Sequence, residues 1–348
     1  MFVHARRRAW RRPALSPRLE PLEGRELLSV FTGATATRAV RTTGGIFQIQ
    51  VSGPGLIKVH SGAHSAISVT AFGTTSATTI TVGQVRPLYH FPSRDLVLNK
   101  VVIVSGQLGS FNATSSELNG SMTQINNTVN SLEFDQIGPN AQIKVNGDVG
   151  TFSANQVNLG PLGQVVISGA LNTSDLTGSM TIGNLNIDSG RIVIGGDSIA
   201  PISVTGDMTI SQNGLFSVGR DMDGSLTVGG DLELNTGGQL FVGRNMSNLT
   251  VDGNLIVNPT GSGIVVNGAL GSVSVSGVFQ GQGGTSTPTL FDLGVGLTLS
   301  GLNIAGGTLS QNGLINANIR AGSTISGQNI TYGLVNSTIQ ENTPPPSA

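Results

Sequence analysis

The chain contains no cysteine, which excludes a disulfide-stabilised scaffold, a thiolate metal site and a thiol nucleophile. Charged residues make up 11 % of the 348 residues and aromatic residues 4 %, whereas about a quarter of the residues in an average soluble protein are charged. No stretch approaches the roughly 18 consecutive apolar residues of a membrane-spanning helix. We therefore expect no transmembrane helix.

Glycine, in contrast, is abundant, with 50 residues, roughly twice the usual share. The glycines have no three-residue period, which excludes a collagen-like triple helix. Val, Ile and Leu are plentiful and the net charge is only −1, whereas classical disorder requires low hydrophobicity and high net charge. The composition predicts a folded protein with many turns, and it names no biochemical activity.

The charge is unevenly distributed along the chain. Residues 1–28 hold seven Arg and three Glu and carry +4, so the remaining residues hold 11 basic (18 − 7) and 16 acidic (19 − 3) residues and carry −5. This asymmetry indicates a tail that is separate from the folded body. A basic tail can contact nucleic acid or a membrane surface, but a targeting or processing segment explains it better. We expect no nucleic-acid partner.

The N-terminal segment lacks the apolar run of about 7–15 residues that a secretory signal needs. Residues 18–29 read RLEPLEGRELLS. After a basic, proline-containing leader, this segment resembles the LEPR-XLL sorting motif of large surface or secreted proteins, especially those of planctomycetes. The matching residues are Leu19, Glu20, Leu22, Glu23, Arg25, Leu27, Leu28 and Ser29. The resemblance implies an extracellular or cell-surface location and no catalysis; the alternative is a short amphipathic helix that packs on the body.

Three consecutive segments align with one another, and they span residues 204–226, 227–249 and 250–273, with lengths of 23, 23 and 24. A step of Gly, then Asp or Asn, then an apolar residue recurs in each segment. It stands at Gly206-Asp207-Met208, Gly230-Asp231-Leu232 and Gly253-Asn254-Leu255. A second step recurs half a segment later, at Arg220-Asp221-Met222, Arg244-Asn245-Met246 and Gly268-Ala269-Leu270. Related phrases continue in both directions at less regular intervals.

Within each repeat, short runs alternate apolar and polar residues, as in Met208-Thr209-Ile210. This alternation is typical of strands, and no sustained helical period is present. Gly, Asp and Asn between the runs favour sharp turns. Short strands and turns at a period of roughly 22–24 residues predict an all-β fold, a single-stranded parallel β-helix or β-solenoid. Coils stacked at about 4.8 Å would build a continuous core.

The predicted organisation has four parts. Residues 1–37 are the basic leader with the sorting-type motif, which is disordered or processed. Residues 38–100 form a small N-terminal β cap or an irregular first part, because a solenoid must cover its open end. Residues 101–340 form the parallel β-helix, and residues 341–348, with three consecutive prolines, form a disordered tail.

Enzymes on β-helices cluster carboxylates with Lys, Arg or His and add aromatic residues that stack on sugars. Here the single Trp lies in the leader, and all four His residues precede the repeat. His60 and His64 could be considered metal ligands, but they lie among small residues on expected strand and turn structure, so we interpret them as solvated. We therefore assign no catalytic, metal-binding or cofactor-binding residue and expect no cofactor.

A series of Asp residues next to turns could be calcium ligands, but the calcium-binding solenoid phrase is absent, and turn formation explains these positions better. The series is Asp148, Asp197, Asp207, Asp221, Asp231 and Asp252. Arg220 and Arg244 would stack on adjacent coils and form a small basic spot. The simpler interpretation is that they are exposed turn residues with Asp neighbours.

The repeat and the leader together resemble planctomycete-type surface β-helix proteins. We expect a non-enzymatic structural or adhesive protein that presents a polar Ser, Thr and Asn surface to envelope or matrix glycans or proteins. The alternative is a carbohydrate-active β-helix enzyme, either a polysaccharide lyase or a glycoside hydrolase. A third interpretation, end-to-end assembly, depends on whether the terminal coils are open or capped.

Overall fold

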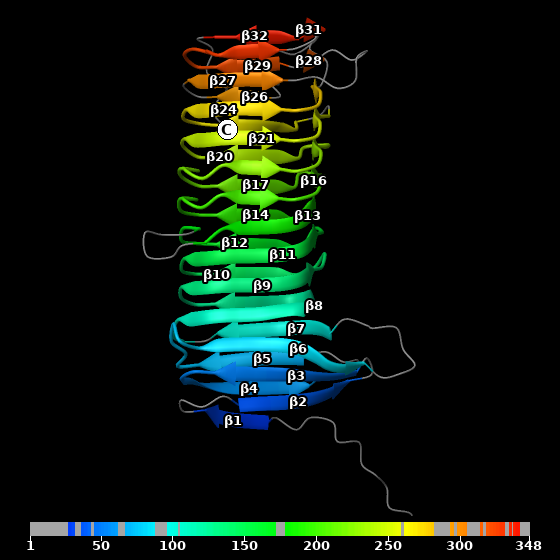
Figure 1. The fold of residues 1–348 in the computed structure, drawn as a ribbon, viewed down its shortest axis with the longest axis vertical. Coiled ribbons are helices and arrows are strands. Elements are labelled where there is room, and N and C mark those ends of the chain that lie inside the picture. Colours follow the sequence, from blue (N-terminus) through cyan, green and yellow to red (C-terminus); the bar gives the residue numbers. More distant parts are fainter. Residues whose placement is uncertain are drawn as a thin grey trace, which may run out of the picture.

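The computed structural model confirms the all-β prediction: its strands stack into a long β-solenoid (Figure 1). The described residues are 27–31, 36–42, 45–61, 67–87, 96–103, 105–171, 178–258, 261–281, 293–295, 298–304, 314–315, 318–330, 334–335 and 337–341. Most of the predicted leader and the proline-rich end of the tail therefore lie outside the described residues.

An antiparallel block lies at the N-terminal end of the stack (Figure 1). Its strands are β1 (Leu27–Phe31), β2 (Ala36–Thr42), β3 (Gly45–Ser52), β4 (Gly55–Ser61), β5 (Ile67–Phe72) and β6 (Thr79–Pro87). They pair antiparallel in the orders β1–β4–β5 and β2–β3–β6. β5 and β6 then pair in parallel with β7 and β8. This block is a small β cap, and it begins at Leu27, inside the segment that the sequence assigned to the leader.

Parallel strands form three ladders, each of which is one face of the solenoid. Face A consists of β7 (Leu96–Ile103), the end of β8 (Leu108–Ile125), β10 (Gln142–Val145), β12 (Gln164–Ile167), β14 (Arg191–Ile194), β17 (Leu215–Val218), β20 (Gln239–Val242), β23 (Gly263–Val266), β26 (Leu293–Val295), β29 (Asn318–Ala321) and β32 (Thr338–Gln340).

Face B starts with the first part of β8 and contains the first residues of three long strands, β9 (Val129–Ile137), β11 (Val149–Leu159) and β13 (Met180–Asp188). It continues through β15 (Ile202–Val204), β18 (Leu226–Val228), β21 (Met246–Val251), β24 (Leu270–Val275), β27 (Leu299–Ile304) and β30 (Gln328–Ile330).

Face C contains the last residues of the long strands, because β13 pairs with β15 through its first residues and with β16 through its last. Its further strands are β16 (Met208–Ser211), β19 (Leu232–Leu234), β22 (Leu255–Val257), β25 (Phe279–Gln280), β28 (Leu314–Ile315) and β31 (Leu334–Val335). In each coil the chain runs from face B to face C and then to face A.

The coil length agrees with the predicted period in the middle of the solenoid and departs from it elsewhere. Leu215 pairs with Gln239, 24 residues on (239 − 215). Near the N-terminal end, Thr123 pairs with Ile143, 20 residues on, and on face C, Phe279 pairs with Leu314, 35 residues on. The added residues fall between strands, so the ladder continues through coils of unequal length.

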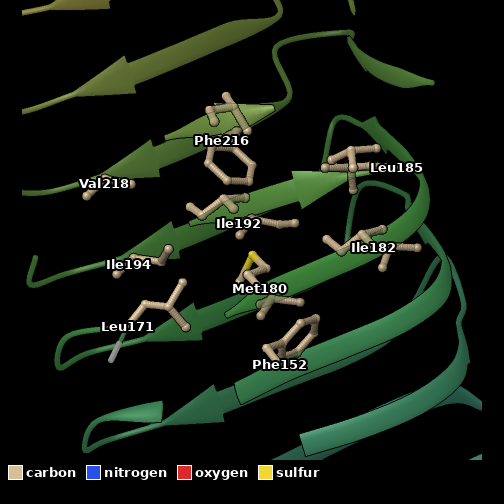
Figure 2. Packing of buried hydrophobic residues seen from close by; sticks show 14 of the residues in the cluster. Phe152, Leu171, Met180, Ile182, Leu185, Ile192, Ile194, Phe216 and Val218 are labelled. Atoms are coloured by element: carbon tan, nitrogen blue, oxygen red, sulfur yellow. The ribbon is translucent and has the colours of Figure 1, made fainter. Parts of the chain in front are cut away.

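The core is a column of apolar side chains enclosed by the three faces. Ile192 and Ile194 of β14 lie below Phe216 and Val218 of β17 (Figure 2), and all four are fully buried. Burial of each such side chain contributes roughly 1.5–3 kcal/mol. The solenoid is therefore stabilised coil by coil rather than by one central cluster.

Aromatic rings stack in the coils next to the cap. The ring centroids of Phe111 and Phe134 are 5.7 Å apart, and those of Phe134 and Phe152 are 6.3 Å apart. In the ladder Phe134 pairs with Ala113 on one side and Ala154 on the other. The small Ala side chains leave room for the neighbouring rings, as close packing requires.

The C-terminal end of the solenoid has a side-chain hydrogen bond where earlier coils have a backbone one. The Leu299 N–H donates to the Thr324 carbonyl of the following coil at 3.0 Å. One coil later, the Ile325 N–H donates instead to Glu341 Oε1 at 2.9 Å. Glu341 was assigned to the disordered tail, but its carboxylate takes the place of the next coil's carbonyl.

Candidate functional site

The corner between faces B and C is held by a column of side-chain oxygens. The Asp207 carboxylate accepts a hydrogen bond from the Asp231 N–H at 2.9 Å, and the Asp231 carboxylate accepts one from the Asn254 N–H at 2.7 Å. The Asn254 amide oxygen accepts one from the Val278 N–H at 3.0 Å. Each coil thus satisfies a corner N–H of the next coil, which explains the recurring Asp and Asn.

A second column follows face A. The Asp197 carboxylate accepts from the Asp221 N–H at 3.2 Å, and the Asp221 carboxylate accepts from the Asn245 N–H at 3.0 Å. The Arg244 N–H donates to the Arg220 carbonyl at 3.1 Å, so these arginines lie on adjacent coils as expected. Arg244 Nη1 lies 3.7 Å from Asp221 Oδ2, and 62 % of the Arg244 side chain is exposed. A pair this exposed contributes little to stability.

Across the described residues, no group of three or more His, Cys, Asp and Glu side chains could hold a metal ion. The corner carboxylates bond to backbone N–H groups, which favours the turn interpretation. Of the histidines, His60 lies on β4, whereas His4, His64 and His90 lie outside the described residues.

The predicted sorting motif is divided by the limit of the described residues. Leu27, Leu28 and Ser29 lie on β1, and they pair with three consecutive residues of β4. For these residues the structure has a strand in place of the helix considered as an alternative. The other matching residues, Leu19, Glu20, Leu22, Glu23 and Arg25, lie outside the described residues.

The outer side of face B carries a continuous column of small polar side chains. Each member pairs with the next, and the members are Ser153, Thr181, Ser203, Thr227, Thr250, Ser274, Asn303 and Asn329. We call this set the hydroxyl column. Its members are partly or fully exposed, and neighbouring strands lie about 4.8 Å apart. The sequence predicted a polar Ser, Thr and Asn surface, but it did not place these residues on one face.

The outer side of face A differs, because it carries a mostly apolar column. The members, which pair in succession across five strands, are Val166, Val193, Ser217, Phe241 and Val265; Ser217 is the one polar member and is buried. Sequence reasoning missed Phe241 as a partly exposed aromatic residue. The signal was available, because the alternation in β20 buries Leu240 and Val242 and turns Phe241 outward.

Comparison of the chain with protein-family models, with curated proteins and with solved structures gives no match. Within the described ranges, no helix has the length and apolar character needed to cross a membrane.

Proposed function

We propose that the protein is a non-enzymatic structural or adhesive component of the cell surface or extracellular matrix. In this proposal, the solenoid presents the hydroxyl column to glycans or proteins. The observation that supports it is the pairing of Ser, Thr and Asn at equivalent positions of successive coils.

The physical argument concerns repeated weak contacts on a rigid support. Each hydroxyl can donate one hydrogen bond and accept others, and each such bond contributes only about 1 kcal/mol net. A polymer that contacts several equivalent hydroxyls adds these contributions while it loses its translational freedom once. A scaffold of paired strands keeps the hydroxyls in place, which lowers the entropic cost of binding.

The cell-surface part of the proposal rests on the LEPR-XLL resemblance of residues 18–29. It is tested by fractionation of cells that express the full chain. We expect the protein in the envelope or the medium. Recovery from the cytosol with residues 1–28 retained would contradict the proposed location.

The binding part is tested on a glycan array, with turnover assayed on the same glycans. Thr227→Val combined with Thr250→Val removes two adjacent hydroxyls of face B at almost constant volume. We expect binding to weaken about thirtyfold, from two lost hydrogen bonds of about 1 kcal/mol each. The matched control is Thr209→Val, which removes an outward hydroxyl of face C and should leave binding unchanged.

Two results would contradict the proposal. Equal binding by the wild type, the double variant and the control would show that the hydroxyl column takes no part. Release of shortened or unsaturated products from a bound glycan would instead support the alternative, a carbohydrate-active β-helix enzyme.

A further inference from the structure

The apolar column of face A has a mostly polar column beside it. Gln164, Arg191 and Gln239 lie two residues before Val166, Val193 and Phe241 on the same strands, and therefore on the same outer side. Leu215 stands between Arg191 and Gln239 in this column. Phe241 is partly exposed. Over these coils, face A therefore offers an apolar strip that contains one aromatic ring, with amide and guanidinium groups along its edge.

The guanidinium in this polar column is held in position. Arg191 Nε and Nη2 donate to Gln164 Oε1 at 3.0 and 2.7 Å. These bonds use two of the five N–H donors of a guanidinium, and Arg191 is exposed. The cation is therefore oriented before any ligand arrives, which lowers the entropic cost of binding.

The charge of this face is opposite in sign to that of the rest of the body. From β10 to β23, no outward position of face A carries Asp or Glu, whereas Lys144 and Arg191 lie there. Beyond the strands, Arg220 and Arg244 share a corner with Asp197 and Asp221, and Arg244 lies 3.7 Å from Asp221, so the positive charge of the face comes from Lys144 and Arg191. Residues 29–348 together carry −5. Charge complementarity therefore favours an anionic partner.

The size of the surface favours a linear partner. Five strands at about 4.8 Å spacing extend roughly 19 Å along the solenoid, and four residues at about 3.3 Å span roughly 13 Å across it. The resulting area of roughly 250 Å² is well below the roughly 800 Å² per partner of a standard protein–protein interface. A single polymer chain fits this strip better than a globular protein does.

We propose that face A binds an acidic polysaccharide whose chain runs along the solenoid axis. Sugar rings have apolar faces and hydroxyl-bearing edges, and acidic sugars add a carboxylate. Phe241 packs against a ring face, Gln239 bonds to hydroxyls, and Arg191 pairs with a carboxylate. This inference rests on the proposed function for the class of partner, and it places binding on a different face from the hydroxyl column.

The test measures binding of the full chain to immobilised polygalacturonate and to neutral dextran of similar length. We expect the wild type to bind polygalacturonate at least tenfold more tightly and to lose affinity as salt is added. Arg191→Gln and Phe241→Ala should each weaken that binding about tenfold. Lys58→Gln removes one positive charge from the cap and Thr209→Val changes an outward position of face C, so both serve as controls that keep the affinity for polygalacturonate.

Circular dichroism confirms that each variant is folded, and Phe241→Leu replaces Phe241→Ala if the smaller residue prevents folding. Single-stranded poly(U) is measured in the same assay as a second polyanion. The inference would be overturned if both face A variants kept the wild-type affinity, or if the wild type preferred dextran or poly(U) to polygalacturonate. If only the Thr227→Val and Thr250→Val double variant loses glycan binding, the inference fails and the proposed function stands. If the wild type binds no glycan, both fail.

Discussion

The glycine of each Gly-Asp corner should be energetically coupled to the carboxylate of the preceding coil. A Cβ placed on Gly230 would lie closer than 3.0 Å to the Asp207 carboxylate oxygen, a separation that real Cβ atoms do not show. To make room, the Asp207 carboxylate must turn away and lose its 2.9 Å bond from the Asp231 N–H. We therefore predict that Gly230→Ala destabilises the protein through Asp207.

The magnitude follows from that bond. Loss of a hydrogen bond to an exposed carboxylate costs about 1–2 kcal/mol, and residual crowding adds about 1 kcal/mol. Gly230→Ala alone should therefore cost about 2–3 kcal/mol, and Asp207→Ala alone about 1–2 kcal/mol. In the double variant the bond is lost only once and the nearest remaining atom is the Gly206 carbonyl carbon at 3.1 Å. The double variant should cost about 1–2 kcal/mol, well below the sum.

Urea unfolding followed by far-UV circular dichroism measures this cycle, because the far-UV signal comes from the strands of the coils. The slope of the transition should stay constant, so that midpoint changes report stability. Gly83→Ala is the matched control, since a Cβ there meets nothing within 4 Å; its effect should be small and additive with Asp207→Ala. Additive costs for Gly230→Ala and Asp207→Ala would refute the proposed contact.

Three further predictions concern the stack as a whole. Phe134→Ala should cost about 3–5 kcal/mol, because it opens a cavity between two rings, and a loss below 1 kcal/mol in urea unfolding would contradict this packing. Glu341→Ala should speed hydrogen exchange at the Ile325 amide, whereas Glu341→Gln, which keeps an acceptor oxygen, should not. Equal exchange rates in both variants would exclude a role for the hydrogen bond from the Ile325 N–H to Glu341. Deletion of residues 215–238, one coil by the register of face A, should give a shorter folded solenoid. Deletion of residues 215–226 should disrupt folding, and equal stability of both deletions would disprove the coil assignment.

The corners show how far local pattern reaches. Gly230-Asp231 could be identified as a turn from residue type alone, and the recurrence of that step predicted the coil. The partner of each corner carboxylate could not be identified, because it is a backbone N–H about 24 residues away and depends on how the coils stack. Phe241 is a similar case: its outward direction follows from alternation, but its ladder neighbours Ser217 and Val265 come from other coils, with Val193 one coil further on.

The scarcity of charge and the abundance of glycine, together with alternating short runs, determined a stacked β-coil, because strand alternation and turn formation are local properties. Only the tertiary structure decided which side chains form columns. Thr181 pairs with Ser203 after 22 residues (203 − 181), but Ser274 pairs with Asn303 after 29 (303 − 274). Ladder register follows the burial of apolar residues rather than a fixed spacing. For this reason the hydroxyl column of face B and the basic, aromatic strip of face A become apparent only once the coils are stacked.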